Sequence, residues 1–289
     1  LAARMMIALR DFWFYQGYHS EAYTWGQKLF PSLDELDTIL TGRFYGYFAS
    51  FAWIMQNMPE AIHYFELSIE TLRITDEKRY IAWALLYAMG ATTNYQSRHE
   101  ETLGFFHEAL QLFEEVDDRA GIATLYNMVG ALHQRMGNYE LAADAFRQCI
   151  ERSRQNGELR RVAINTMNLG KVKGLQGEPE AGSILLKEAG EIMQKIGFRY
   201  MLLYILTSYV DLLVEVNLYK EALVVASAYF SLSESLGMKI QPWSMDALNR
   251  AIDQIKKHLD TDIYQSAQTY GQSMTLERIN DYTLSITLE

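Results

Sequence analysis

Six histidines are the side chains of this sequence best suited to hold a metal ion or to move a proton near neutral pH. They are scattered along the chain without a recognised metal-ligand spacing. These histidines are His19, His63, His99, His107, His133 and His258. A nucleophile motif of the GxSxG type is absent, and so is a phosphate-binding GxxxxGK[ST] loop. We therefore expect no catalytic residues, no metal and no cofactor, and we interpret the chain as a non-enzyme.

Charge and cysteine content exclude further classes of function. The 36 acidic residues outnumber the 26 basic ones, and the net charge of −10 argues against direct nucleic-acid binding. The single cysteine, Cys149, rules out an intrachain disulfide and fits a small buried position on a helix. No run approaches the roughly 18 apolar residues of a membrane span, and no signal-peptide layout is present. We expect a cytoplasmic protein without a membrane partner.

The sequence predicts that any site is carried by helices, and the helical pattern is clearest in residues 119–157. Apolar residues recur there at three- and four-residue steps on both sides of a turn at Gly137. Small residues alternate with large ones, which lets paired helices approach closely. The large and small positions are Tyr126, Gly130, Tyr139, Ala142 and Phe146. This arrangement resembles the tetratricopeptide repeat (TPR), whose single hairpin cannot bury its own apolar surface and needs copies.

The copies recur with a period of about forty residues. Stepping from Gly137 places turn-forming residues at Gly17, Asn57, Ser97, Gly137, Gly177 and Asn217. Three central copies have a glycine seven residues before the turn, at Gly90, Gly130 and Gly170. The second helices of the last three copies are expected to end at Gly157, Gly197 and Gly237. Because the usual TPR period is about 34 residues, each helix should be nearly a turn longer.

The sequence thus predicts an all-α fold, a TPR-like superhelix of about six helical hairpins with a C-terminal helical cap. The hairpins are expected over approximately 1–40, 41–77, 78–117, 118–157, 158–197 and 198–240. After Gly237 the period stops, and 241–289 is expected to form the cap. Its predicted helices cover 245–259 and 261–270, and a last short helix is capped by Thr275. The cap would cover the apolar face of the sixth hairpin.

Both ends of the chain resemble the helical-repeat region of MalT-like, LuxR-type regulators and related signal-transduction ATPases of the STAND class. The opening pattern is Phe12-Trp13, Gly17-Tyr18, Ser20-Glu21 and Trp25. The closing pattern is Ala267, Gly271, Met274, Thr275, Leu276 and Glu277. The sequence departs from the family at Ala22 and Gly26. This resemblance implies a bacterial sensor or interaction region whose nucleotide-binding domain lies upstream in the same polypeptide, and the chain itself begins within a predicted helix.

A binding groove is expected on the concave wall, which the first helix of each hairpin lines. The candidate groove residues, chosen by the helical step, are Tyr47, Phe51, Tyr87, Asn94, Asn127, Gln134, Arg135, Lys171, Asp211 and Glu215. Aromatic and amide groups together suit a peptide or a small polar ligand. The aromatic run 44–48 favours a cleft in the second copy. The alternative is that Tyr47, Phe51 and Tyr87 are packing residues.

Two functions remain from the sequence alone. The first is a sensor that binds a protein, a peptide or a small effector in the groove and biases an upstream switch, as part of a signal-transducing ATPase or a transcriptional regulator. The second is a passive scaffold for oligomerisation or complex assembly. The expected partners are a protein or peptide, the upstream nucleotide-binding domain and, for the scaffold, further copies of this chain.

Overall fold

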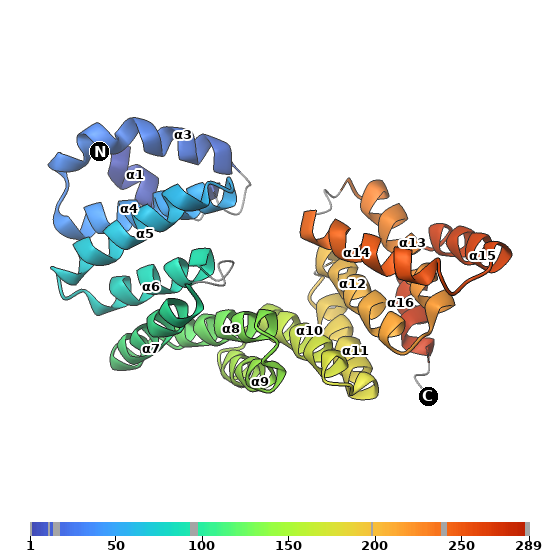
Figure 1. The fold of residues 1–289 in the computed structure, drawn as a ribbon. Coiled ribbons are helices and arrows are strands. Elements are labelled where there is room, and N and C mark those ends of the chain that lie inside the picture. The colour runs from blue at the N-terminus through green and yellow to red at the C-terminus, as the bar shows by residue number, and fades with distance from the viewer. Residues whose placement is uncertain are drawn as a thin grey trace. The chain divides into compact units, whose positions relative to one another are not determined.

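The structure is a computed structural model that describes residues 2–10, 12–13, 18–92, 98–197, 199–237 and 242–286. All regular elements in these ranges are helices, so the predicted all-α class is confirmed. Contacts divide the chain into two compact units, Leu1–Leu132 and His133–Glu289. Figure 1 shows the first unit in blue to green and the second in green to red. Within the described residues, the helices are too short or too polar to cross a membrane.

The N-terminal unit consists of a short first pair of helices followed by longer antiparallel pairs. Its elements are α1 (Ala2–Ala8), α3 (His19–Leu29), the 3₁₀ helix η1 (Phe30–Glu35), α4 (Thr38–Ile54), α5 (Met58–Arg73), α6 (Lys78–Thr92) and α7 (His99–Glu115). Helix α8 (Arg119–Arg135) crosses the boundary between the units. The helix α4 packs along α5, and α6 packs along α7 (Figure 1), as the short connections require.

Aromatic side chains of α4 form the core of this unit. Phe44, Phe48 and Phe51 are completely buried. The ring of Phe30 lies against Phe44 and Phe48, with centroids 5.4 and 4.8 Å apart. Edge-to-face pairs of this kind add to the free energy of burial. The aromatic run 44–48 is therefore largely explained by packing between η1, α4 and α5, and it does not by itself mark a cleft.

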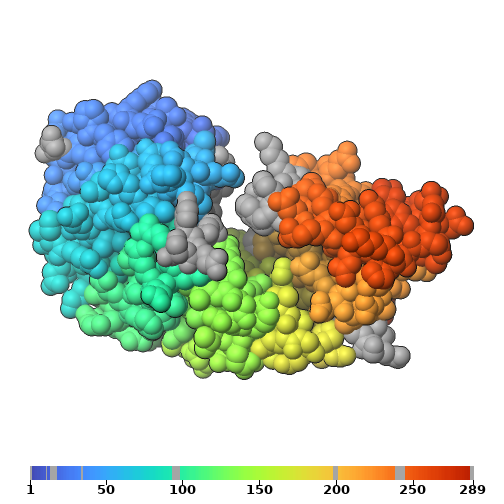
Figure 2. Space-filling model, viewed as in Figure 1, coloured from blue at the N-terminus to red at the C-terminus, as the bar shows by residue number. Residues whose placement is uncertain are grey.

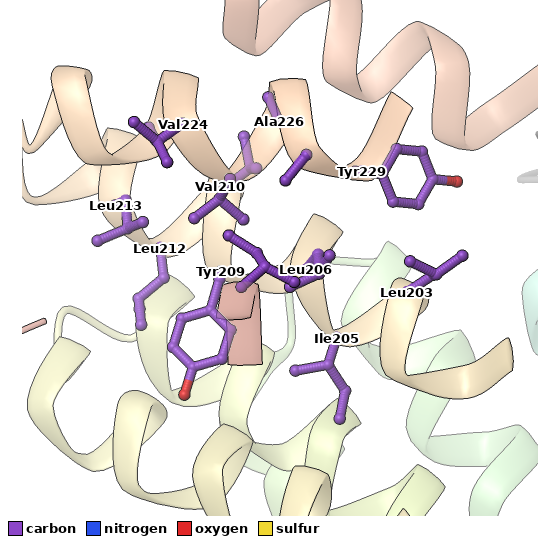
Figure 3. Packing of buried hydrophobic residues seen from close by; sticks show 14 of the residues in the cluster. Leu203, Ile205, Leu206, Tyr209, Val210, Leu212, Leu213, Val224, Ala226 and Tyr229 are labelled. Atoms are coloured by element: carbon purple, nitrogen blue, oxygen red, sulfur yellow. The ribbon is translucent and has the colours of Figure 1, made fainter. Parts of the chain in front are cut away.

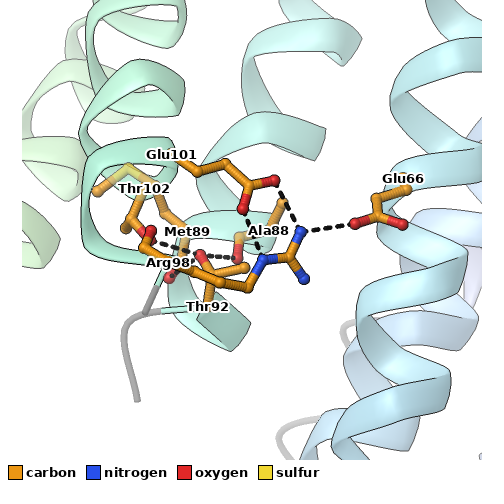
Figure 4. Close-up of polar contacts among 7 residues, drawn as sticks. All are labelled: Glu66, Ala88, Met89, Thr92, Arg98, Glu101 and Thr102. Carbon is orange, nitrogen blue, oxygen red and sulfur yellow. Dashed lines mark hydrogen bonds and ion pairs between the residues drawn. The ribbon is translucent and has the colours of Figure 1, made fainter. Parts of the chain in front are cut away.

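Polar contacts join α5, α6 and α7 around Arg98. The Arg98 guanidinium donates to Glu66 of α5 at 2.7 Å and also pairs with Glu101 of α7 (Figure 4). This hydrogen bond to Arg98 lowers the pKa of Glu101. Beside this group, the buried Thr102 hydroxyl donates to the Thr92 hydroxyl at 2.9 Å, which links α7 to the end of α6. Buried hydroxyl groups are thereby satisfied where the helices meet.

The C-terminal unit contains the most regular part of the repeat. Its elements are α9 (Tyr139–Gln155), α10 (Leu159–Leu175), α11 (Pro179–Lys195), α12 (Arg199–Glu215), α13 (Tyr219–Ser235), α14 (Pro242–Ile255), α15 (Thr261–Gln272) and α16 (Leu276–Ser285). Helices α9 to α13 each have 17 residues, with three residues between successive helices. Two such helices and their connections produce the period of forty, so the longer helices expected from the sequence are confirmed.

Each of these five helices, and α8 before them, is followed by a residue in the left-handed backbone region. These residues are Gly137, Gly157, Gly177, Gly197, Asn217 and Gly237, with φ between 60° and 77°. Glycine adopts this conformation without the steric cost that a Cβ imposes, which explains why it recurs. In the second copy the left-handed residue is Gln56, with φ of 63°, one position before the predicted turn residue Asn57. Asn57 has φ of −85° and precedes the first residue of α5.

Helix α12 is buried on two faces. Figure 3 shows Leu206 and Val210 directed towards α13, whereas Tyr209 and Leu212 point to the opposite side. All four side chains are at most 3% exposed. A helix inside a stack of hairpins needs two apolar faces, because its own partner covers one face and the neighbouring hairpin covers the other. This explains why most side chains of α12 are apolar and buried.

Helices α10 and α11 approach closely through glycines. A Cβ on Gly170 would lie 2.9 Å from the carbonyl oxygen of Gly182, and one on Gly182 would lie 2.8 Å from that of Gly170. These distances are too short for any side chain unless the backbone shifts. The glycine seven residues before the turn in this copy therefore allows the two backbones to touch.

The three helices after the repeats pack on α12 and α13. Helix α14 contacts both of them, and α15 lies along α13, where Gly271 allows close approach to the carbonyl of Val224. In the view of Figure 2, atoms of α14 and α15 cover much of one face of this unit (orange to red). The Thr275 hydroxyl accepts a hydrogen bond from the backbone N–H of Arg278 at 3.3 Å, as the capping prediction required. The expected helix 245–259 begins earlier, at Pro242, and ends at Ile255.

Candidate ligand-binding cleft

A cleft of about 440 Å³ lies among α10, α12 and α14 within the C-terminal unit. This volume is in the range of sites that hold small molecules or a few residues of peptide. Its lining residues are Lys171, Gly174 and Leu175 from α10, Ser208, Asp211, Leu212, Val214 and Glu215 from α12, and Ala247, Arg250, Ala251 and Gln254 from α14. All three helices belong to the same compact unit, so the cleft is defined by contacts inside it.

Helical spacing places these residues on one face of each helix. On α12, Ser208, Asp211 and Glu215 are separated by three and four residues, and on α14 the same steps separate Ala247, Arg250 and Gln254. Residues three and four apart are neighbours on a helix surface. Each helix therefore presents a continuous strip of side chains to the cleft.

An ion pair crosses the cleft between α10 and α12. Lys171 Nζ lies 2.7 Å from Asp211 Oδ2, and the two side chains are 35% and 38% exposed. Glu215 and Arg250 add one charge of each sign to the lining, and both are exposed. The cleft therefore offers two cationic and two anionic side chains that water, or a ligand that replaces water, can reach.

The floor of the cleft is apolar and closely packed. Leu212 is 3% exposed, and its Cδ1 atom would lie 2.7 Å from a Cβ placed on Gly174. The missing side chain at Gly174 thus allows α12 to approach α10 below the ion pair. Leu212 and Ala251, also buried, provide a floor on which an apolar part of a ligand can lie.

Three of the ten residues predicted to line a groove meet in this cleft. The helical step predicts that Lys171, Asp211 and Glu215 point away from the paired second helix, and all three line the cleft. Their contribution to binding stays a prediction. The structure adds that Lys171 and Asp211 are partners in one ion pair.

The remaining candidates lie elsewhere. Phe51 is completely buried against Trp13, so it is a packing residue and cannot line a groove. Tyr47 and Tyr87 are half-buried in the N-terminal unit, and both rings face the guanidinium of Arg10. Asn94 lies outside the described residues. The other candidates, all on α8 and absent from the lining of this cleft, are Asn127, Gln134 and Arg135.

Sequence reasoning missed the contribution of α14. Arg250 and Gln254 enter the lining from this helix, which the sequence suggested only as a cap. Lys171, Asp211 and Glu215 could be predicted because they lie within the forty-residue repeat. This repeat ends before α14 begins. The helical pattern of 245–259 was visible, but no repeat position indicated which helices it would contact.

Comparisons with known proteins now identify the repeat. Residues 80–155 match the family model described as "Tetratricopeptide repeat". This segment of the chain is similar to the tetratricopeptide repeat. Among curated proteins, no sequence gives a significant match. The matched segment comprises α6 to α9, and it includes the hairpin in which the pattern is clearest in the sequence.

Several solved structures share the fold. The Rap conjugation gene regulator of plasmid pLS20 in complex with the Phr* peptide is 15% identical, with 93% of this chain and 76% of that chain covered and a TM-score of 0.60. The STAND protein with a TPR sensor from Pyrococcus horikoshii is 15% identical, with 92% and 44% covered and a TM-score of 0.59. Aspartyl phosphate phosphatase F from Bacillus subtilis is 12% identical, with 90% and 75% covered and a TM-score of 0.61. At these identities the similarity shows the fold alone.

Proposed function

We propose that this chain is the sensor region of a larger signal-transduction protein, an ATPase or a transcriptional regulator, and that it binds a short peptide in the cleft among α10, α12 and α14. The observation that carries the proposal is the Lys171–Asp211 ion pair above an apolar floor. In support, one solved structure of similar fold is a regulator in complex with a peptide, and another is a STAND protein with a TPR sensor.

The charges of the cleft suit a ligand that carries both signs. A peptide offers an ammonium group, a carboxylate and a row of amides, which Asp211, Lys171 and Gln254 can respectively receive. The ion pair is about one-third exposed, so opening it costs little free energy, on the order of 0–1 kcal/mol. A ligand can therefore replace each partner of the pair without leaving a charge buried and unpaired.

Binding in this cleft would couple the repeats to α14. The lining comes from two repeat helices and from one helix beyond the repeats, so a ligand that contacts all three stabilises one arrangement of α14 against α12. A ligand with different affinities for two arrangements shifts their populations, and this is the requirement for a sensor. The signal-transducing partner in this proposal is a domain of the same polypeptide.

The proposal can be tested by adding a pool of pentapeptides with free ammonium and carboxylate ends to the chain. The same peptides, acetylated at the N-terminus and amidated at the C-terminus, serve as the comparison. We expect free-ended members to raise the melting temperature and to bind saturably by calorimetry. Capping both ends should weaken binding at least about tenfold, because a change of tenfold corresponds to about 1.4 kcal/mol and charge-assisted hydrogen bonds are worth about that much.

Matched variants locate the binding. Lys171→Met and Asp211→Asn should each weaken peptide binding at least about tenfold and change stability by less than about 1 kcal/mol. Arg154→Met is the control, because Arg154 forms an ion pair of the same length, 2.7 Å, with Glu188 outside the cleft. If no peptide binds saturably, or if Lys171→Met binds as the unsubstituted chain does, the proposed site is wrong.

The scaffold alternative rests on a different observation. Exposed apolar side chains lie on α1, on α3 and between these two helices in the N-terminal unit, namely Met5, Leu9, Phe12, Tyr18 and Trp25, each 39% exposed or more. Exposed apolar groups on neighbouring helices are typical of an interface with another chain. Light scattering across a concentration series distinguishes the two functions: self-association without peptide binding supports the scaffold.

A further inference from the structure

Arg43 of α4 lies among tyrosines in the N-terminal unit. Its guanidinium carbon is 4.6 Å from the ring centroid of Tyr80 and 5.9 Å from that of Tyr47. Arg43 Nη2 also donates to the Tyr47 hydroxyl at 3.4 Å. The Tyr47 ring also faces Arg10, whose guanidinium carbon lies 5.2 Å from the ring centroid. Arg10 in turn lies 5.0 Å from the ring centroid of Tyr87. The result is a row of alternating guanidinium groups and phenol rings from three helical segments.

The charge of Arg43 is not neutralised by a carboxylate of the described residues. Arg73 pairs with Glu108, Arg79 with Asp118, and Arg98 with both Glu66 and Glu101, all in the same unit. Among the described residues, Arg43 by contrast has only ring contacts and the long hydrogen bond to Tyr47. Its Nε–H is buried, and no described residue accepts a hydrogen bond from it. In a chain of net charge −10, a half-buried cation without a counter-ion is unusual.

We propose that Arg43 and its tyrosines, which we call the Arg43 site, bind an oxyanion, either a carboxylate or a phosphoryl group. A guanidinium has five N–H donors in a planar fork that matches both groups, and most of the donors of Arg43 are unused. The rings of Tyr47 and Tyr80 hold the fork in place, so little side-chain freedom is lost when an anion binds. Arg43, Tyr47 and Tyr80 are each only half-buried, so an anion can approach from solvent.

The Arg43 site is independent of the cleft in the other unit. Its residues all precede position 133, where the C-terminal unit begins. Failure of one proposal therefore does not affect the other.

The ring contacts of Arg43 alone would stabilise the fold, and an Arg43 with a purely structural role would not respond to any particular anion. The test must consequently measure a response that is specific to the anion.

NMR of the arginine Nε–H groups in the full chain provides this measurement. The probes are inorganic phosphate, acetate and, as a control for ionic strength, sodium chloride. The Arg43 signal, assigned from its loss in Arg43→Lys, should shift saturably with phosphate or acetate and should differ from its response to chloride. A saturable response to acetate assigns the site to carboxylates as well, whereas a response to phosphate alone assigns it to phosphoryl ligands.

A matched arginine and a conservative variant complete the test. The Arg73 signal should not show saturation, because Glu108 already occupies its guanidinium. The anion should raise the melting temperature of the chain, and the concentration dependence of this rise gives an apparent affinity. In Arg43→Lys this affinity should be at least about tenfold weaker, since lysine lacks the planar fork. Arg73→Lys should leave that rise unchanged. If the Arg43 signal follows phosphate, acetate and chloride equally, the proposed site is wrong, and this result needs no variant to fold.

Discussion

At the scale of single residues, burial changes the acidity of two tyrosines in the C-terminal unit. Tyr209 of α12 is 3% exposed, and burial raises its pKa to about 12, although a hydrogen bond with Ser183 opposes the shift. Burial, with smaller contributions from Glu221 and Tyr270, likewise raises the pKa of Tyr282 to about 12. Loss of either proton would place a charge in an apolar environment, so the folded state resists ionisation.

These pKa values predict a loss of stability at high pH. The folded pKa of Tyr209 is above the unfolded value of about 10, so its contribution is complete below pH 10 and is lost as the pH rises towards 12. The contribution is at most about 2–3 kcal/mol for this tyrosine. Urea unfolding at pH 8 and pH 11.5 measures it. Tyr209→Phe should lose less stability between these two pH values than the unsubstituted chain, and an equal loss would contradict the burial argument.

At the scale of elements, the left-handed residue at each helix end fixes the connection to the next helix. Gly177 has φ of 77°, and a Cβ at this position would touch nothing within 4 Å. The cost of a side chain there is therefore purely conformational. Residues without the freedom of glycine pay about 1–2 kcal/mol in this backbone region.

Substitutions at two helix ends test this account in opposite directions. Gly177→Ala should lower the free energy of unfolding by about 1 kcal/mol, because alanine must adopt the left-handed conformation. Gln56→Gly should raise it by a few tenths of a kcal/mol or more, because Gln56 already adopts φ of 63°, which glycine reaches without steric cost. Urea titration of both variants measures the changes. Equal destabilisation by both would show that loss of other contacts, and not φ, dominates.

At the scale of the whole molecule, the division into two units predicts that ligands act locally. A peptide bound among α10, α12 and α14 contacts only residues of the C-terminal unit. Hydrogen exchange should therefore slow in 159–175, 199–215 and 242–255 when the peptide is added. Exchange in α4 and α5 should stay within error of the ligand-free chain. Protection of α4 and α5 alone would contradict the proposed place of binding.

The anion proposed for the Arg43 site should give the opposite pattern. Phosphate should slow exchange in α4 and α6, which carry Arg43, Tyr47 and Tyr80, and leave α10 and α12 unchanged. The same measurement thus separates the two sites, and phosphate protection confined to α10 and α12 would contradict the Arg43 site.

The sequence by itself determined the helices and their repetition. Helix length, left-handed ends and close-packed glycines are local properties, so Gly137, Gly170 and Gly177 could be interpreted from spacing alone. It also placed Lys171 and Asp211 on exposed positions of first helices, because helical periodicity fixes the direction of a side chain relative to its partner helix.

Only the tertiary structure decided which of these side chains meet. The pairing of Lys171 with Asp211 depends on how two hairpins stack, and the arrival of Arg250 depends on where α14 packs after the repeat has ended. Likewise, Phe51 and Tyr47 are four residues apart on one helix, yet Phe51 is completely buried against Trp13, whereas Tyr47 is half-buried and faces Arg10. Contacts between residues distant in the chain follow from how the helices pack, so a local sequence pattern does not predict them.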